Sequence, residues 1–250
     1  KPIIFMDGGL DRYMAMADET ASELLDGNDP LVAGLRKYDE FMRRDLWTHT
    51  SIAPGLGFVL AMNACMMFLG GVRMALSGHS AAVFPILRTA LESASYAVII
   101  QREPELGDVW SNRHESATHR RECRRKFSFE RGVRHLDNTA PELLTLARQV
   151  YEGSIDYGAH PNVKGVAGHL SIDEEREDEN IAVTLTALYG SGHIETVRGL
   201  CACLDFGLSI IALIALADPE VTKTINEDLQ KLSDLKNEAT ATYMRVPEDD

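Results

Sequence analysis

The chain has 250 residues, which suits one large domain or two small ones, and its hydrophobic content of 45% is that of an ordinary globular protein. A formal net charge of −13 argues against broad, non-specific binding to nucleic acid or anionic membrane, although a local basic site is still compatible with it. The cysteines show no disulfide-framework spacing, so we expect reduced thiols, a cytoplasmic protein, and neither a metal nor another cofactor.

Two amphipathic helices are predicted before residue 50. Apolar residues recur at helical spacing from Asp7 to Leu25, and the turn at 27–30 ends that helix. Pro30 opens a second helix that runs to about Trp47. We expect these N-terminal helices, within residues 7–47, to pack on a more apolar core.

Three long apolar segments predict that core, at residues 54–76, 82–102 and 192–217. The uncharged run at 50–72 and the run at 199–217 are each long enough to raise the question of a membrane span. Both are rich in small residues, as central helices of a tightly packed bundle are. We therefore favour buried helices and expect no membrane contact.

One cation and one anion interrupt the second core segment. Arg88 and Glu92 are four residues apart, so they share a helical face, while apolar residues cover most of the rest of that helix. A buried charge must be paired. The pair is either a structural ion pair that fixes helix register or part of a polar pocket.

A basic segment follows on a helix predicted from Pro104 to about Phe129. Between residues 113 and 135 there are eight Arg or Lys and three Glu. Four of the arginines recur at intervals of seven and four and are expected to form one stripe. The stripe would bind phosphate or RNA backbone, or it would pair with acidic groups of this chain or of a dimer partner. The basic residues are Arg113, Arg120, Arg121, Arg124, Arg125, Lys126, Arg131 and Arg134.

The next segment, residues 153–165, reads as an ordered loop rich in Gly. Its Tyr157, His160 and Asn162 offer hydrogen-bond donors and acceptors, although a simple turn whose histidine caps a helix would have the same composition. Short β-branched runs then predict a β-hairpin near residues 166–188 with a strongly acidic connection. The whole pattern predicts an all-α, antiparallel helical bundle in a single domain, with this small hairpin as an insertion.

Three short patterns also carry a resemblance. The segment Leu87-Arg88-Thr89-Ala90-Leu91-Glu92, the helix at 110–125 and the segment at 157–162 resemble an uncharacterised family of bacterial all-helical proteins that is loosely grouped with HEPN domains. The resemblance covers roughly residues 77–162. It implies a helical bundle that is commonly a homodimer, and some HEPN proteins are metal-independent ribonucleases with an Arg-x4–6-His motif whose second residue is polar.

Two segments of this chain match that motif, Arg44 to His49 and Arg113 to His119. The second lies in the basic segment and is the better candidate. By the resemblance, Arg113 would steady a phosphate and His119 would transfer a proton, as histidine side chains commonly do in catalysis. Neither match lies near the end of the bundle, where the nuclease motif usually lies.

Two functions are therefore expected. The first is a non-catalytic bundle that binds a partner or a small molecule through a polar pocket. The alternative is a ribonuclease of a bacterial toxin or defence system, acting through Arg113 and His119. The expected ligand-binding residues of the pocket are Arg88, Glu92, Tyr157, His160 and Asn162.

Overall fold

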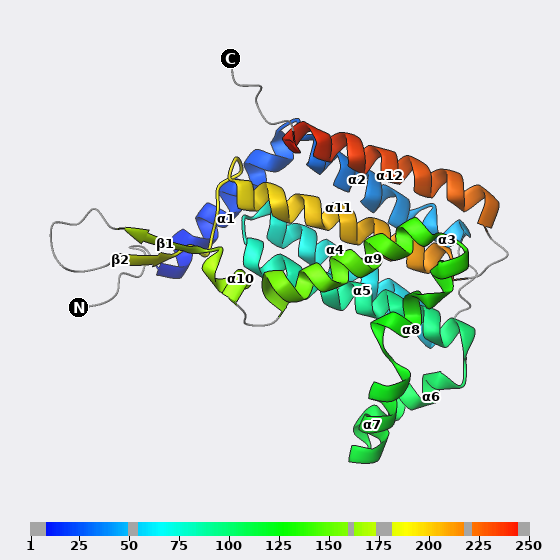
Figure 1. Ribbon diagram of the computed structural model, residues 1–250. Helices are drawn as coiled ribbons and strands as arrows, with labels where there is room; N and C mark the ends of the chain where they lie inside the picture. Colours follow the sequence, from blue (N-terminus) through cyan, green and yellow to red (C-terminus); the bar gives the residue numbers. More distant parts are fainter. Residues whose placement is uncertain (1–8, 50–54, 160–162, 174–181, 218–221, 245–250) are drawn as a thin grey trace.

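The computed structural model describes residues 9–49, 55–159, 163–173, 182–217 and 222–244. The chain is an all-α helical bundle, as predicted, in which six long helices lie side by side (Figure 1). These are α2 (Pro30–Arg43), α4 (Leu56–Leu76), α5 (Ser80–Arg102), α9 (Pro141–Ser154), α11 (Ile194–Ala215) and α12 (Thr222–Met244).

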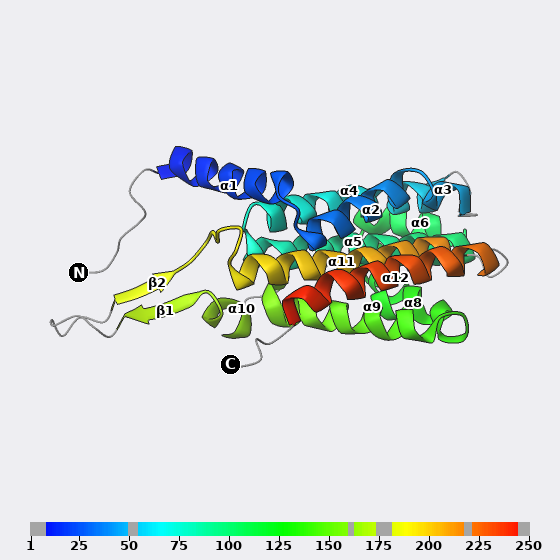
Figure 2. The same ribbon diagram turned by 90° about the horizontal axis from the view of Figure 1, so that it is seen from above.

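The other helical elements lie around these six helices. The remaining helices and turns are α1 (Gly9–Asp26), α3 (Leu46–His49), α6 (Leu106–Ser111), η1 (Asn112–His114), α7 (Ala117–Lys126), α8 (Phe129–Val133), η2 (Arg134–Asn138), η3 (Ile155–Ala159) and α10 (Val163–Ala167). Helix α1 and the two strands extend past the same end of the bundle, whereas α6 and α7 project near the opposite end (Figures 1 and 2).

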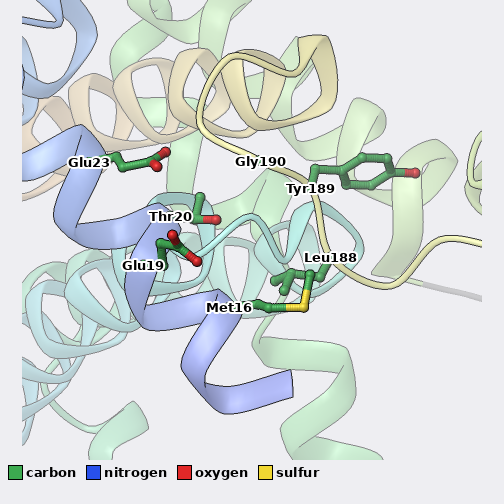
Figure 3. Close-up of a pocket in the computed structure, with 7 residues that line it drawn as sticks. All are labelled: Met16, Glu19, Thr20, Glu23, Leu188, Tyr189 and Gly190. Atoms are coloured by element: carbon green, nitrogen blue, oxygen red, sulfur yellow. The ribbon is translucent and has the colours of Figure 1, made fainter. Parts of the chain in front are cut away.

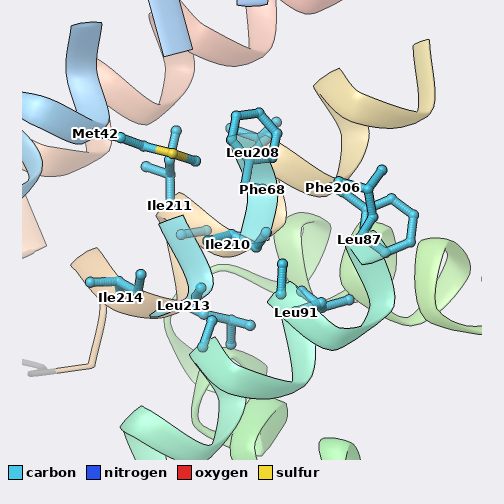
Figure 4. Packing of buried hydrophobic residues seen from close by; sticks show 14 of the residues in the cluster. Met42, Phe68, Leu87, Leu91, Phe206, Leu208, Ile210, Ile211, Leu213 and Ile214 are labelled. Atoms are coloured by element: carbon cyan, nitrogen blue, oxygen red, sulfur yellow. The ribbon is translucent and has the colours of Figure 1, made fainter. Parts of the chain in front are cut away.

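Helix α11 is the centre of the core. It packs against α2, α4, α5, α9 and α12, and its second half is buried on all sides. Side chains from α2, α4 and α5 meet it in the packing of Figure 4. Gly207 brings α11 close to its neighbours, because a Cβ there would lie 2.7 Å from the Tyr38 ring and 2.9 Å from the Phe68 ring. The charge of Asp205, in mid-helix, is paired with Lys236 of α12 at 2.9 Å.

Three of the described helices, α4, α5 and α11, are long and apolar enough to cross a membrane by length and composition alone. Their most apolar windows differ in burial within the bundle, at 39%, 67% and 78% respectively. The prediction of buried helices therefore describes α5 and α11 well, whereas α4 keeps one apolar face exposed. That face carries Val59, Met62, Met66 and Leu69.

The prediction of one continuous helix from Pro104 to Phe129 is wrong. The chain forms α6, η1 and α7 there, followed by α8. Two serines start new helices, because Ser116 accepts the backbone N–H of His119 and Ser128 accepts that of Arg131, each at 3.2 Å. The arginines at 113 and 131 consequently lie outside α7, and the predicted four-arginine stripe does not form on one helix.

Helix α5 begins at Ser80 and continues through Pro85, which has no backbone N–H to offer the carbonyl of Ala81. The η3 turn packs at this point. A Cβ at Gly158 would lie 3.1 Å from the Ala81 oxygen, and Gly158 has a φ of +146°, which favours glycine. The loop that carries Tyr157 is therefore positioned by the interruption that Pro85 makes in α5.

Two strands, β1 (Leu170–Asp173) and β2 (Ala182–Leu185), pair antiparallel with Leu170 opposite Leu185 and Asp173 opposite Ala182. They are shorter than the runs predicted near 166–188, and the first run begins with the end of helix α10 in place of a strand. The acidic connection at 174–181 lies outside the described residues.

Candidate functional site

Arg88 and Glu92 lie together with a third residue that sequence reasoning missed, Tyr151 of α9. The Arg88 Nε donates to Glu92 Oε1 at 3.0 Å, and the Arg88 Nη2 donates to the Tyr151 hydroxyl at 2.9 Å. The hydroxyl in turn donates to the same Glu92 oxygen at 3.1 Å. The three groups form a closed ring of hydrogen bonds that joins α5 to α9.

Aromatic side chains pack around this ring. The Tyr151 ring lies 4.7 Å from the Arg88 guanidinium carbon and stacks on Phe129 at 4.0 Å, with an interplanar angle of 6°. Burial raises the pKa of the Tyr151 hydroxyl, and Glu92 adds to the rise. The side chains of Arg88 and Glu92 are 19% and 31% exposed. They are thus partly desolvated and mutually neutralised, which fits the interpretation as a structural ion pair.

The other predicted pocket residues are not joined to this ring in the part of the chain that the structure describes. Tyr157 packs on Phe84, with ring centroids 5.7 Å apart, one helical turn before Arg88. No hydrogen bond links it to Arg88 or Glu92 among the described side chains. His160 and Asn162 lie outside the described residues.

The proposed ribonuclease pair is also not brought into contact. The Arg113 Nε is buried and has no hydrogen-bond partner among the described residues, while His119 Nδ1 lies 2.9 Å from the Ser116 hydroxyl and 3.8 Å from Glu115. No described hydrogen bond or ion pair joins Arg113 to His119. Cys123 is 4% exposed, and burial raises the pKa of its thiol despite the opposing charge of Arg113.

Of the two motif residues in the first match to the nuclease motif, Arg44 and His49, only the arginine has a described side chain. Arg44 pairs with Glu40 at 3.3 Å on α2. His49 ends the short helix α3, but its side chain lies outside the description.

Helix α7 carries a cationic surface that we call the arginine face. At 100° per residue, its four arginines fall within an arc of about 140°. Cys123 lies outside this arc and is buried against the bundle, so the arc faces solvent, and all four side chains are exposed. The only acidic residue of α7 is Glu122. The arginine face consists of Arg120, Arg121, Arg124 and Arg125.

These arginines differ from the other cations of the chain. Outside residues 113–134, every described Arg or Lys side chain takes part in a hydrogen bond, an ion pair or another polar or ring interaction. None of the four arginines of the arginine face has such a partner among the described residues. Unpaired positive charge is thus concentrated on the helix that projects from the bundle (Figure 1).

Arg131 and Arg134, which the sequence placed with these arginines, behave differently. Arg131 on α8 donates through Nη2 to both carboxylate oxygens of Glu103, each at 2.6 Å, so its charge is already balanced. Arg134 is exposed but lies in η2, away from α7. Within the predicted basic segment, Arg131 therefore serves structural pairing, whereas four arginines of α7 form the arginine face.

Comparison of the chain with family models, with curated proteins and with solved structures found no match.

Proposed function

We propose that this protein is a non-catalytic helical bundle that binds the phosphodiester backbone of RNA through the arginine face of α7. The observation that carries the proposal is the absence of partners for four exposed arginines among the described residues, in a chain whose other described cations are almost all paired. The sequence also predicted a protein that binds a partner, but through a polar pocket around Arg88 and Glu92. The site proposed here is the arginine face of α7.

The chemistry of the arginine face suits phosphate. A guanidinium group presents a planar fork of donors that binds two phosphate oxygens at once. Arginines four residues apart, such as Arg120 and Arg124, are about 6 Å apart along the helix axis. A helix can therefore present several forks to successive phosphates, and binding would be driven by the release of counterions from the nucleic acid.

Other polyanionic partners fit the arginine face less well. A helix that lies in a membrane interface buries apolar side chains beneath its cations, whereas the inner face of α7 is occupied by contacts with the bundle, such as Cys123. Protein interfaces need a desolvated core with few charged groups, and the arginine face has no large apolar side chain within its arc. A strand of phosphates needs neither feature.

The proposal is tested by fluorescence anisotropy with a labelled single-stranded RNA in low salt. Arg121→Gln/Arg125→Gln should weaken binding by roughly tenfold or more, since two phosphate contacts are lost. The matched control is Arg43→Gln/Arg44→Gln, which removes two exposed arginines that already have acidic partners on α2. Equal loss in both variants, or no saturable binding by the wild type, would contradict the proposal. Binding measurements with single-stranded DNA and with vesicles of anionic lipid show whether the arginine face prefers RNA to other molecules that carry phosphate.

Whether the RNA in the same samples stays intact distinguishes this proposal from the ribonuclease alternative. A non-catalytic binder leaves the RNA intact over hours without metal. Metal-independent cleavage that disappears in both Arg113→Ala and His119→Ala would instead assign hydrolysis to this pair.

We also propose that the protein is a homodimer whose copies meet through the exposed apolar face of α4. Four large apolar side chains on that face are 38–67% exposed, and they follow one another at helical spacing without an intervening charge. A face of this kind can pack against its own copy across a two-fold axis.

A further inference from the structure

A cleft of about 300 Å³ opens between α1 and the segment that follows β2, far from α7 (Figures 1 and 3). The turn between α4 and α5 holds this segment in place, because the backbone N–H of Tyr189 donates to the carbonyl of Gly78 at 3.1 Å. Gly78 has a φ of +77° and lies so close that a Cβ would be 2.0 Å from the Tyr189 oxygen. The cleft is lined by Met16, Glu19, Thr20, Glu23, Leu188, Tyr189 and Gly190.

Thr20 is the buried polar group of this cleft. The residue is only 6% exposed, and its hydroxyl has no hydrogen bond to any described residue. Other threonines within helices donate to the carbonyl four residues earlier, as Thr89, Thr145 and Thr240 do. Figure 3 shows the Thr20 side chain directed into the cleft between the two glutamates and Leu188. The Thr20 oxygen is therefore reached from the cleft, where a ligand can hydrogen-bond to it.

The charge of the cleft is negative. Glu19 and Glu23 are one helical turn apart on α1, and both side chains border the cleft. Glu23 accepts a hydrogen bond from the Ser191 hydroxyl at 2.6 Å, whereas the Glu19 carboxylate has no partner among the described residues. Two carboxylates beside a hydroxyl that has no partner among the described residues would attract a cation that carries its own hydrogen-bond donors.

The other side of the cleft is apolar. Figure 3 shows the side chains of Met16 and Leu188 meeting there, while the Tyr189 ring points away from the glutamates. That ring is held elsewhere, stacked on His193 at 4.4 Å. The cleft therefore combines a short hydrophobic wall with a polar, anionic wall, as amphipathic ligands require.

We propose that this cleft binds a small organic cation, namely a primary alkylammonium with a short aliphatic body. The three N–H donors of an ammonium match the carboxylates of Glu19 and Glu23 and the hydroxyl of Thr20, and the aliphatic body packs on Met16 and Leu188. A hard divalent cation fits less well, because it needs six or more oxygen ligands. The described residues contain no group of three or more His, Cys, Asp or Glu side chains arranged to hold a metal ion.

Isothermal titration calorimetry of the full chain with 1-aminobutane tests the proposal, with 1-butanol, Mg²⁺ and Ca²⁺ as comparison ligands. Saturable binding of the amine is expected, without measurable binding of the alcohol. Glu19→Gln should raise the Kd about tenfold, because a charge-assisted hydrogen bond is lost. Glu152→Gln removes an exposed carboxylate on α9 and should leave the Kd unchanged.

The hydroxyl is tested separately from packing. Thr20→Val keeps the shape of the side chain and should raise the Kd several-fold, whereas Thr20→Ser keeps the hydroxyl and should bind as the wild type does. Absence of saturable binding by the wild type would overturn the proposal, as would equal Kd values for Glu19→Gln and Glu152→Gln. Tighter binding of Mg²⁺ or Ca²⁺ than of 1-aminobutane would replace it with a divalent cation site.

Discussion

The hydroxyl of Tyr151 accepts a hydrogen bond from the guanidinium of Arg88 at 2.9 Å, and this contact ties α9 to the middle of α5. Tyr151→Phe removes the hydroxyl but keeps the ring that stacks on Phe129. The Arg88 Nη1 already has no partner among the described residues, so the variant would leave a second partly buried N–H unsatisfied. We expect a loss of about 1–2 kcal/mol in the free energy of unfolding, measured by urea denaturation.

The control for this variant is Tyr157→Phe. Its hydroxyl has no hydrogen bond among the described residues, and the side chain is 45% exposed. The free energy of unfolding should change by less than about 0.5 kcal/mol. An equal loss in the two variants would show that the Tyr151 hydroxyl has no special role.

Substitution of Gly78 is expected to destabilise the fold. Its positive φ and its approach to the Tyr189 carbonyl leave no room for a methyl group. Gly78→Ala should lower the free energy of unfolding by more than about 2 kcal/mol, because backbone atoms must move apart. Gly153→Ala, where a Cβ meets nothing within 4 Å, should be neutral or slightly stabilising. Thermal unfolding of the two variants side by side distinguishes a steric cause from a general sensitivity to alanine.

His135 gives the protein a pH-dependent stability. Burial lowers the pKa of His135 to about 4, although its Nδ1 donates to the Gly132 carbonyl at 2.8 Å. The unfolded chain binds this proton near pH 6.5, so folding loses free energy as the pH falls from about 6.5 towards 4. We expect a loss of about 1–3 kcal/mol from this residue.

Carboxylates titrate in the same range, so the measurement is the difference between variants. His135→Gln should flatten the fall of stability between pH 6.5 and pH 4 relative to the wild type. His114→Gln, an exposed histidine, should follow the wild-type curve. Parallel curves for all three proteins would remove His135 as the cause.

The proposed dimer is tested on α4. Met66 is 67% exposed at the centre of the apolar face, and Met66→Glu would place a charge inside the interface. Sedimentation equilibrium should show a dimer for the wild type and a monomer for this variant. Val163→Glu changes an even more exposed apolar residue, on α10, and should stay dimeric. A monomeric wild type at tens of micromolar would end the proposal.

Much of the fold could be predicted because its signals are local. The apolar runs that became α4, α5 and α11 specify their own helices, and the need to pair Arg88 correctly placed it beside Glu92. Tyr151 could not be found in this way, since it reaches Glu92 across 59 positions of sequence. The breaks at Ser116 and Ser128 were missed, although a serine before a new helical turn is a recognised cap.

The arginine face and the cleft beside Thr20 were harder to predict from the sequence than the fold was. The basic character of residues 113–134 was evident, but only the structure separates Arg131, paired with Glu103, from the unpaired arginines of α7. The cleft beside Thr20 had no sequence signal, because its two walls come from segments more than 160 residues apart.

The central claim is that the arginine face contacts phosphates, and the salt dependence of RNA binding tests it most directly. For four phosphate contacts with a single strand, log K should fall with log[salt] with a slope of about −3. Arg121→Gln/Arg125→Gln should halve that slope, while Arg43→Gln/Arg44→Gln should keep it. A slope near zero for the wild type, or the same slope in all three proteins, would contradict the account.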